Sequence, residues 1–391
     1  MSSSKVTETS RGDTAKCHLS IASPTLPDLE ALLPRLRDIW ASGELTNGRT
    51  VAELERAVEN LMPGRHVVAV NSCTSGLMLA LRVLGVQGEV LLPSFTFTAT
   101  AHAVVWNGCT PVFVDCSADT LNIDLEDLQR KITPRTTAIV AVYVSGNPPA
   151  LEALESVARK HGLRLVLDAA HALGSSYQGR PAGTFGDAEV FSLSPTKTIT
   201  TCEGGLVSVR APEVAAKLRM GRNYANPGNY DCQFVGLNAR LSEVHALVGV
   251  ESLKMLRPNV EARQKLVRLY KQALAGVPGV RFQEVRAGNE CSFKDLSLRI
   301  VASEFGMTRD ALRAELTRAG IETRTYFAPP VHLQTAYKTW RGTYEGKLPV
   351  TEQVATEVLN LPLHTRLVPF DVQRVVEAVE AGAARPVRAR G

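Results

Sequence analysis

The chain has 391 residues, of which 45% are hydrophobic and 21% are charged, and its formal net charge is +5. This composition is typical of a globular protein that is long enough for one large and one smaller domain. The positive charge is spread along the chain, which favours a mildly anionic small substrate over a nucleic acid. No apolar run approaches the ~18 residues of a membrane helix. The seven cysteines are odd in number and include no Cys-x-x-Cys pair, which argues against a disulfide framework or a zinc site and predicts a cytoplasmic protein.

The N-terminal part is expected to form a tail followed by a helical arm. Residues 1–20 are rich in Ser and Thr and lack the apolar core of a signal peptide, so we expect a disordered tail. Leu29–Trp40 and Thr50–Leu61 each show helical spacing of apolar residues, with turn residues between them. We expect these two helices to pack against the large domain.

Strands and helices alternate through the middle of the chain. The predicted strands are His66–Val70, Glu89–Pro93, Pro111–Asp115, Thr137–Val144, Leu163–Asp168 and one that begins at Ala188. Helices are predicted from Leu77, at Asp124–Ile132 and at Pro149–His161, the last of which ends at Gly162. This alternation predicts a mostly parallel sheet with helices on both faces. Gly-x-Gly-x-x-Gly, phosphate-loop and Gly-x-Ser-x-Gly motifs are absent, so hydride transfer, NTP hydrolysis and ester hydrolysis have no motif support.

A carboxylate and a lysine follow two neighbouring strands of this predicted sheet. Asp168 ends a short apolar run, at the position where open parallel sheets bind ligands. Lys197 follows the next strand among threonines, with no adjacent carboxylate to hold it charged. An amine that condenses with an aldehyde and an acid that faces a ring nitrogen are what a protein contributes to pyridoxal phosphate (PLP) chemistry. An Asp–pyridinium pair ~4 Å apart at an effective dielectric constant of ~20 gains about 4 kcal/mol, enough to keep the ring protonated. The alternative is a surface lysine and a capping acid.

Three motifs of the sequence resemble those of the DegT-type sugar aminotransferases, which are PLP enzymes of the aspartate aminotransferase fold (fold type I). The motifs are Asp-Ala-Ala-His from Asp168, Phe-Ser-x-x-Pro-Thr-Lys ending at Lys197, and Glu-Gly-Gly from Glu203. The resemblance implies an α/β large domain with a mostly parallel sheet flanked by helices and a smaller α+β C-terminal domain. We place the large domain with its arm at residues 21–258 and the small domain at residues 259–391.

Helices predicted at Ser242–Leu256 and Pro258–Ala275 should lead from the large domain into the small one. In the small domain the residue pattern predicts strands at Ser292–Val301 and Ile321–Arg324, with a helix at Thr308–Ala319 between them. This alternation is typical of an α+β domain.

The resemblance assigns cofactor contacts residue by residue. Thr74, Ser75 and Ser192 match residues that hold the PLP phosphate, and Phe97 matches the residue that lies against the ring. From the residues alone, helix capping is the stronger interpretation of Thr74 and Ser75, and packing in the core is the stronger interpretation of Phe97. His171 matches a residue near the ring hydroxyl. A core histidine or a metal ligand is the alternative, but the sequence offers no Cys/His cluster for a metal.

Three further positions are implicated in substrate binding and in a shared site. The segment Gly236–Glu243 resembles a loop that reaches into the other subunit's site, so Asn238 is expected at the neighbour's cofactor and Arg240 at the substrate. From the residues alone, both could equally be polar side chains of an exposed loop. His332 matches a histidine at the substrate mouth, whereas its apolar surroundings alone indicate packing. The segment between Arg222 and Arg240 is expected to line the nucleotide-sugar entrance, because an arginine fork pairs two diphosphate oxygens at once.

These features predict a PLP-dependent aminotransferase that moves an amino group from an amino acid, L-glutamate by resemblance, to a keto group of a nucleotide-linked sugar. The turn at Gly146–Pro148 and the Asn238–Arg240 loop most resemble those of enzymes that aminate 4-keto-6-deoxyhexoses on a dTDP carrier, so the resemblance implies a dTDP-4-keto-6-deoxyhexose as the acceptor. A C3 keto-sugar or cyclitol aminotransferase is the alternative. A sugar dehydratase would carry histidine at Lys197, and a non-catalytic relative would be expected to lose Lys197 or Asp168. The shared loop predicts a homodimer.

Overall fold

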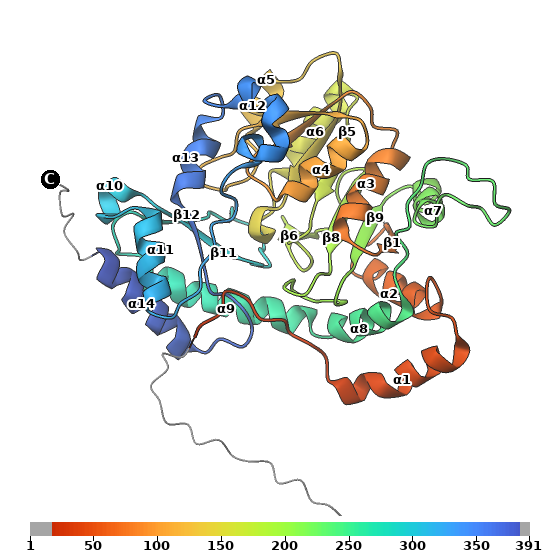
Figure 1. Ribbon diagram of the computed structural model, residues 1–391, viewed down its shortest axis with the longest axis horizontal. Helices are drawn as coiled ribbons and strands as arrows, with labels where there is room; N and C mark the ends of the chain where they lie inside the picture. Colours follow the sequence, from red (N-terminus) through yellow and green to blue (C-terminus); the bar gives the residue numbers. More distant parts are fainter. Residues whose placement is uncertain (1–17, 384–391) are drawn as a thin grey trace, which may run out of the picture.

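A seven-stranded sheet forms the centre of the protein in the computed structural model, which describes residues 18–383 (Figure 1). The strand order is β1-β9-β8-β5-β4-β2-β3. All strands are parallel except β9, which runs antiparallel to both of its neighbours. The strands are β1 (His66–Val70), β2 (Glu89–Pro93), β3 (Thr110–Val114), β4 (Thr136–Val142), β5 (Arg164–Asp168), β8 (Ala188–Ser192) and β9 (Gly205–Val209). The predicted mostly parallel sheet is therefore confirmed.

The strands have short apolar sequences because both faces of the sheet are covered. In β1, Val67 and Ala69 belong to one hydrophobic core, whereas Val68 and Val70 belong to the core on the opposite face. Successive side chains of a strand point to opposite faces, so a strand buried on both sides has no polar alternation.

Helices cover each face of this sheet. One face is covered by α3 (Cys73–Val83), α4 (Thr98–Trp106) and α7 (Pro212–Gly221). The other face is covered by α2 (Arg49–Glu59), α5 (Leu125–Arg130), α6 (Leu151–His161) and α8 (Glu243–Leu253). The arm helix α1 (Leu29–Ser42) packs against α8. As predicted, α6 ends at Gly162, whose left-handed φ of 64° suits a residue without a side chain.

A three-stranded antiparallel sheet, β10-β11-β12, forms the small domain (Figure 1). Its strands are β10 (Val280–Phe282), β11 (Leu296–Ile300) and β12 (Val358–Leu361), and its helices are α9 (Leu256–Leu274), α10 (Ala302–Phe305), α11 (Arg309–Arg318) and α14 (Pro369–Ala383). The start of α9 packs in the large-domain core, and its second half packs in the small-domain core. The domain boundary therefore lies inside a continuous helix.

The two domains are not continuous in sequence. Val331, Tyr337 and Tyr344 belong to the core of the large domain, although they follow most of the small domain in the chain. They lie in the short 3-10 turns Val331–Leu333 and Thr335–Tyr337 and in α12 (Lys338–Tyr344), after which α13 (Pro349–Glu357) leads back to β12. The prediction that all of residues 259–391 belong to the small domain was therefore wrong for residues 331–344. Tyr337 and Tyr344 of this segment pack against the Phe113 ring of β3 in the large domain.

Two other expectations need correction, one for the N-terminal tail and one for a predicted strand of the small domain. Leu19 is buried in the small-domain core and its N–H donates to Gly320 O at 2.9 Å, so the end of the predicted tail is structured. Residues 1–17 lie outside the described part of the chain. The strand predicted at Ile321–Arg324 is reduced to isolated bridges, Leu19 with Ile321 and Arg324 with Asn360. A separate short hairpin, β6 (Ser176–Tyr177) and β7 (Arg180–Pro181), lies outside the central sheet.

Within residues 18–383, none of the helices combines the length and the apolar character needed to span a bilayer.

Candidate active site

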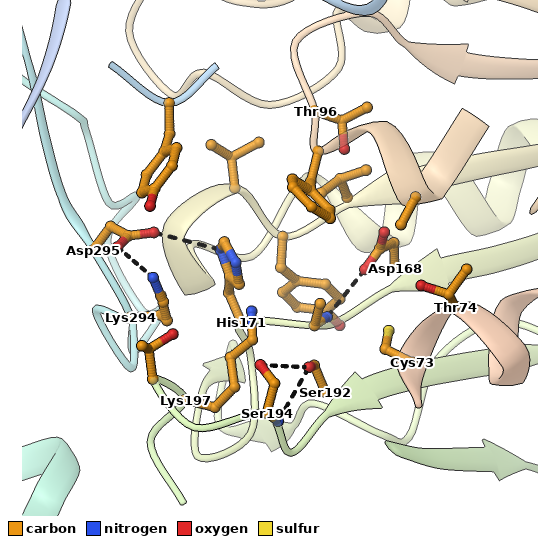
Figure 2. A pocket seen from close by; sticks show the side chains of 18 of the residues that line it. Cys73, Thr74, Thr96, Asp168, His171, Ser192, Ser194, Lys197, Lys294 and Asp295 are labelled. Carbon is orange, nitrogen blue, oxygen red and sulfur yellow. Dashed lines mark hydrogen bonds and ion pairs between the residues drawn. The ribbon is translucent and has the colours of Figure 1, made fainter. Parts of the chain in front are cut away.

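A cavity of about 350 Å³ opens at the carboxyl ends of the parallel strands (Figure 2). Its wall comes from the segments that follow β1, β2, β4, β5 and β8, and from residues 294–295 and 326–327 at the small-domain side. Because parallel strands all end at the same edge, residues that are far apart in sequence meet here. Asp168 and Lys197, singled out from the sequence, both line this cavity.

Asp168 is a buried carboxylate with both oxygens held. Its Oδ2 accepts a hydrogen bond from Thr100 Oγ1 at 2.7 Å, and its Oδ1 accepts one from Ala170 N at 3.1 Å. Burial raises the pKa of Asp168, while these two hydrogen bonds and the nearby Lys197 oppose the rise. A buried carboxylate in this position is stabilised by any cation that enters the cavity, and a protonated ring nitrogen is such a cation.

Lys197 lies in a turn after β8 that is fixed by the neighbouring threonines. Thr198 Oγ1 donates to Leu173 O, and Thr200 Oγ1 donates to Leu193 O at 3.0 Å. Burial and, to a lesser degree, the positive charge of Lys294 lower the pKa of Lys197 to about 8. At neutral pH the amine is still mostly charged, but its neutral, nucleophilic fraction is far larger than that of an ordinary lysine with a pKa of 10.5.

The start of α3 forms an anion-binding corner of the cavity. Ser72 caps the helix by accepting from Ser75 N at 3.1 Å, and Thr74 lines the cavity. A Cβ on Gly205 would lie 2.7 Å from Cys73 N, so only glycine lets β9 approach the helix start this closely. Ser192 at the end of β8 lines the same cavity. Free N–H groups and hydroxyls of this kind bind phosphate.

Of the residues that were expected at the phosphate, Ser75 does not line the cavity. Its hydroxyl donates to Asn71 Oδ1 at 2.7 Å and also contacts Ser72 Oγ at 2.8 Å. In this chain it serves the helix cap, which was the alternative derived from the residues alone.

Phe97 and His171 both line the cavity. The side chain of Phe97 is 58% exposed, so its ring is available to a ligand. His171 Nδ1 lies 3.9 Å from Asp295 Oδ2. Burial lowers the pKa of His171 well below its ordinary value, and Lys197 and Lys294 add to this effect, so the imidazole is neutral at neutral pH.

Several lining residues were not expected from the sequence. Lys294 Nζ forms an ion pair with Asp295 Oδ1 at 2.7 Å and lies 5.5 Å from the centre of the Tyr326 ring. Phe327 faces Phe97 at a ring distance of 6.5 Å. The only sequence signal was the charged pair Lys294-Asp295 directly before the apolar strand β11, and charged pairs at strand starts are common on protein surfaces.

The loop residues Asn238 and Arg240 do not reach the cavity of their own chain. Arg240 Nη1 donates to Asn223 Oδ1 at 2.7 Å, and its guanidinium lies 5.4 Å from the centre of the Tyr224 ring. Asn238 is exposed, and its carbonyl accepts from Asn71 Nδ2. The loop after α7 extends away from the body of the protein at the right of Figure 1.

Two other candidate residues, Arg222 and His332, have structural partners instead. Arg222 is buried and pairs with Glu55 at 2.5 Å, so it does not line an entrance as expected. His332 is fully buried, with Nδ1 2.6 Å from Ser94 Oγ and Nε2 3.2 Å from Glu352 Oε1, and it does not line the cavity. Burial lowers the pKa of His332. Within this chain the side chains of Arg222 and His332 therefore hold neighbouring segments of the fold together.

The lining residues fit PLP. The helix start at Thr74 with Ser192 suits the phosphate, the buried Asp168 suits a protonated ring nitrogen, and Lys197 suits the aldehyde. Phe97 offers an aromatic face to the ring.

Comparisons with known proteins agree with this geometry. Residues 28–380 match the DegT/DnrJ/EryC1/StrS aminotransferase family. The chain is 33% identical to GDP-perosamine synthase of Caulobacter vibrioides, covering 93% of this chain and 97% of that protein. It is 31% identical to dTDP-4-amino-4,6-dideoxy-D-glucose transaminase of Escherichia coli, covering 89% and 94%. Among solved structures, DesI, crystallised in the presence of its TDP-sugar product, matches with a TM-score of 0.89 and 37% identity over 94% of this chain and 93% of DesI.

The family match covers nearly the whole described chain, and the solved relatives include sugar aminotransferases in their PLP and PMP forms. The protein therefore belongs to the DegT/DnrJ/EryC1/StrS family of PLP-dependent sugar aminotransferases.

Proposed function

We propose that this protein transfers the amino group of L-glutamate to the 4-keto group of a dTDP-linked 4-keto-6-deoxyhexose in the cytoplasm. The observation that carries the chemistry is that Asp168 and Lys197 line one cavity, one as a buried carboxylate and the other as an amine with a pKa of about 8. The acceptor is supported by the relative named as a dTDP-4-amino-4,6-dideoxy-D-glucose transaminase and by DesI with its TDP-sugar product.

Lys197 carries out the proton transfers in this proposal. With the donor bound, its neutral Nζ would remove the proton from the α-carbon of the donor. It later delivers a proton to C4 of the sugar. PLP supplies the electron sink and carries the amino group between the two half-reactions. The pKa of about 8 suits both directions, because the amine can gain and lose a proton near neutral pH.

The other lining residues hold and enclose the reacting groups. Asp168 keeps the ring nitrogen protonated, and Thr100 holds that carboxylate in place. Thr74 and Ser192 would bind the phosphate with the N–H groups at the start of α3, and the neutral His171 would lie near the ring hydroxyl. Phe97 would cover the ring.

We propose that the enzyme is a homodimer with shared sites. The Gly236–Glu243 loop is anchored at one end, because the Glu243 carboxylate accepts from Gly48 N, Thr50 N and Val51 N. Asn238 and Arg240 do not line the chain's own cavity and would complete the cavity of the neighbour. Exposed apolar side chains also favour a partner, among them Trp106, Tyr230 and Val235 at 74%, 93% and 75% exposure.

The acceptor can be tested with protein that L-glutamate has converted to the amine form of the cofactor. Keto substrates are then added one at a time, and the return of the aldehyde-form absorption band is followed. We expect the dTDP-4-keto-6-deoxyhexose to restore the band faster than UDP- or GDP-linked 4-keto sugars, dTDP-3-keto sugars and cyclitol ketones. A faster response to a 3-keto sugar would assign the other position, a possibility favoured by the 35% identity to a dTDP-3-amino-3,4,6-trideoxy-α-D-glucose transaminase of Streptomyces venezuelae.

A further inference from the structure

A second ammonium group lies in the cavity beside Lys197. Lys294 is only 8% exposed, yet it lines the cavity, and its positive charge is close enough to depress the pKa of Lys197. Figure 2 shows Lys294 and Asp295 on the wall opposite Cys73 and Thr74. Among the described residues that line the cavity, Lys294 is the only Lys or Arg besides Lys197.

The position of Lys294 is fixed by contacts from both domains. Its backbone N–H donates to Ser145 O at 3.0 Å, next to the end of β4. Its carbonyl accepts from Arg263 Nη1 of α9, also at 3.0 Å. The Nζ is held by Asp295 at 2.7 Å and lies over the Tyr326 ring. A lysine side chain anchored in this way loses little additional conformational freedom when it binds a ligand.

The charges around Lys294 do not cancel. Asp295 is influenced by two cations, Lys294 and the buried Arg263, whose pKa is lowered by burial to about 10, so that it stays charged at neutral pH. The group of Lys294, Asp295 and Arg263 therefore carries a net charge of +1. An ammonium has three N–H donors, and the ion pair with Asp295 uses one of them. The remaining donors can bind an anion on the side of Lys294 that faces away from Asp295.

We propose that Lys294 binds the α-carboxylate of the amino donor, with Asp295 and Arg263 as positioning residues; the proposal rests on the aminotransferase function above. Lys197 has to reach the α-carbon of the donor, and the α-carboxylate is bonded to that carbon. A cation beside Lys197 is therefore close enough to bind the α-carboxylate, whereas the side-chain end of the donor lies farther from Lys197. A charge-assisted contact of this kind is among the stronger ones in a protein.

The test uses two amines that differ only at this carboxylate. 2-Methylalanine has an α-carboxylate but no α-hydrogen, so it can displace Lys197 from the cofactor without being turned over. tert-Butylamine carries a methyl group in place of the carboxylate. Both are titrated against the PLP-loaded protein, and binding is read from the change in cofactor absorption. In Lys294→Met, we expect the Kd of 2-methylalanine to rise at least tenfold and that of tert-butylamine to stay within about twofold.

Two further variants control for fold and charge. Lys271→Met removes a lysine that packs against the rings of Phe282 and Phe293 outside the cavity, and it should leave both Kd values unchanged. Lys294→Gln provides a neutral polar replacement and should raise the Kd of 2-methylalanine as much as Lys294→Met does.

If Lys294→Met raised the Kd values of both amines equally, Lys294 would act on Lys197 and not on a carboxylate. If neither Kd value changed, Lys294 would only form its ion pair with Asp295 and would not bind the donor. Either result overturns the proposal. The titration contains no keto sugar, so a wrong acceptor in the proposed function would leave its outcome intact.

Discussion

Thr100 Oγ1 donates a 2.7 Å hydrogen bond to Asp168 Oδ2, and this bond connects the first turn of α4 to the end of β5. The Thr100 hydroxyl in turn lies 2.8 Å from Thr96 Oγ1. The carboxylate proposed to face the ring nitrogen is thus held from a neighbouring helix. Its orientation does not depend on the cofactor alone.

The first prediction concerns this pair. Asp168→Asn removes the ionic partner of the ring nitrogen and should slow the half-reaction with L-glutamate by about 10³-fold, equivalent to ~4 kcal/mol. Thr100→Val leaves the charge but removes one hydrogen bond to it, and should slow the reaction by about tenfold to hundredfold. Single-turnover absorption measures both rates. Near-normal rates in Asp168→Asn would contradict the proposed role of the carboxylate.

The second prediction concerns the pH dependence of Lys197. The ordinary lysine pKa of 10.5 is lowered to about 8 here, chiefly by burial. Below pH 8 the amine is mostly charged and not nucleophilic. The rate at which cofactor-free protein binds PLP covalently should therefore rise about tenfold per pH unit below pH 8 and level off above it.

The same profile tests the neighbour of Lys197. Lys294→Met removes a positive charge that lowers the Lys197 pKa, so the inflection should move to higher pH. Lys271→Met is the control. A wild-type inflection near 10.5 would show that Lys197 is not perturbed, and Lys197→Ala should form no covalent bond at any pH.

The third prediction tests the shared site. Lys197→Ala and Arg240→Ala homodimers should each turn over keto sugar slowly, but a mixed dimer would contain one cavity with an intact Lys197 and the neighbour's intact Arg240. Unfolding and refolding the two variants together should therefore restore activity to a fraction of the dimers. No recovery, with mixed dimers confirmed by native mass spectrometry, would place Arg240 outside the neighbour's site.

The fourth prediction separates Arg222 from substrate binding. Arg222 and Glu55 form a buried ion pair, with side chains 8% and 7% exposed. Arg222→Ala leaves the Glu55 charge without this partner and should lower the free energy of unfolding by about 3–5 kcal/mol. Arg219 also pairs with Glu55 but is 40% exposed, and Arg219→Ala should cost less than about 1 kcal/mol. Denaturant unfolding measures both.

The KM of Arg222→Ala for the keto sugar should stay unchanged wherever the protein is folded. If the folded Arg222→Ala variant had a raised KM for the keto sugar, Arg222 would line the nucleotide-sugar entrance after all, as the sequence suggested.

The sequence by itself determined the sheet and the reacting pair. The strands at His66–Val70 and Glu89–Pro93 were predicted with the bounds that the structure shows, because strands covered on both faces need continuous apolar residues. Asp168 and Lys197 could be singled out because they follow such strands, and a parallel sheet brings the ends of its strands to one edge.

The tertiary structure alone decided which other charges reach the cavity. Lys294 and Asp295 lie about a hundred residues from Lys197 in the sequence, and only the packing of β11 and α9 brings them to the cavity wall. Arg222 had the sequence environment of a surface loop, but Glu55, 167 residues away, draws it into the interior. Local pattern shows which face of an element is buried, whereas the partner of a buried charge is chosen by long-range packing, because its desolvation must be offset by whichever opposite charge the fold places beside it.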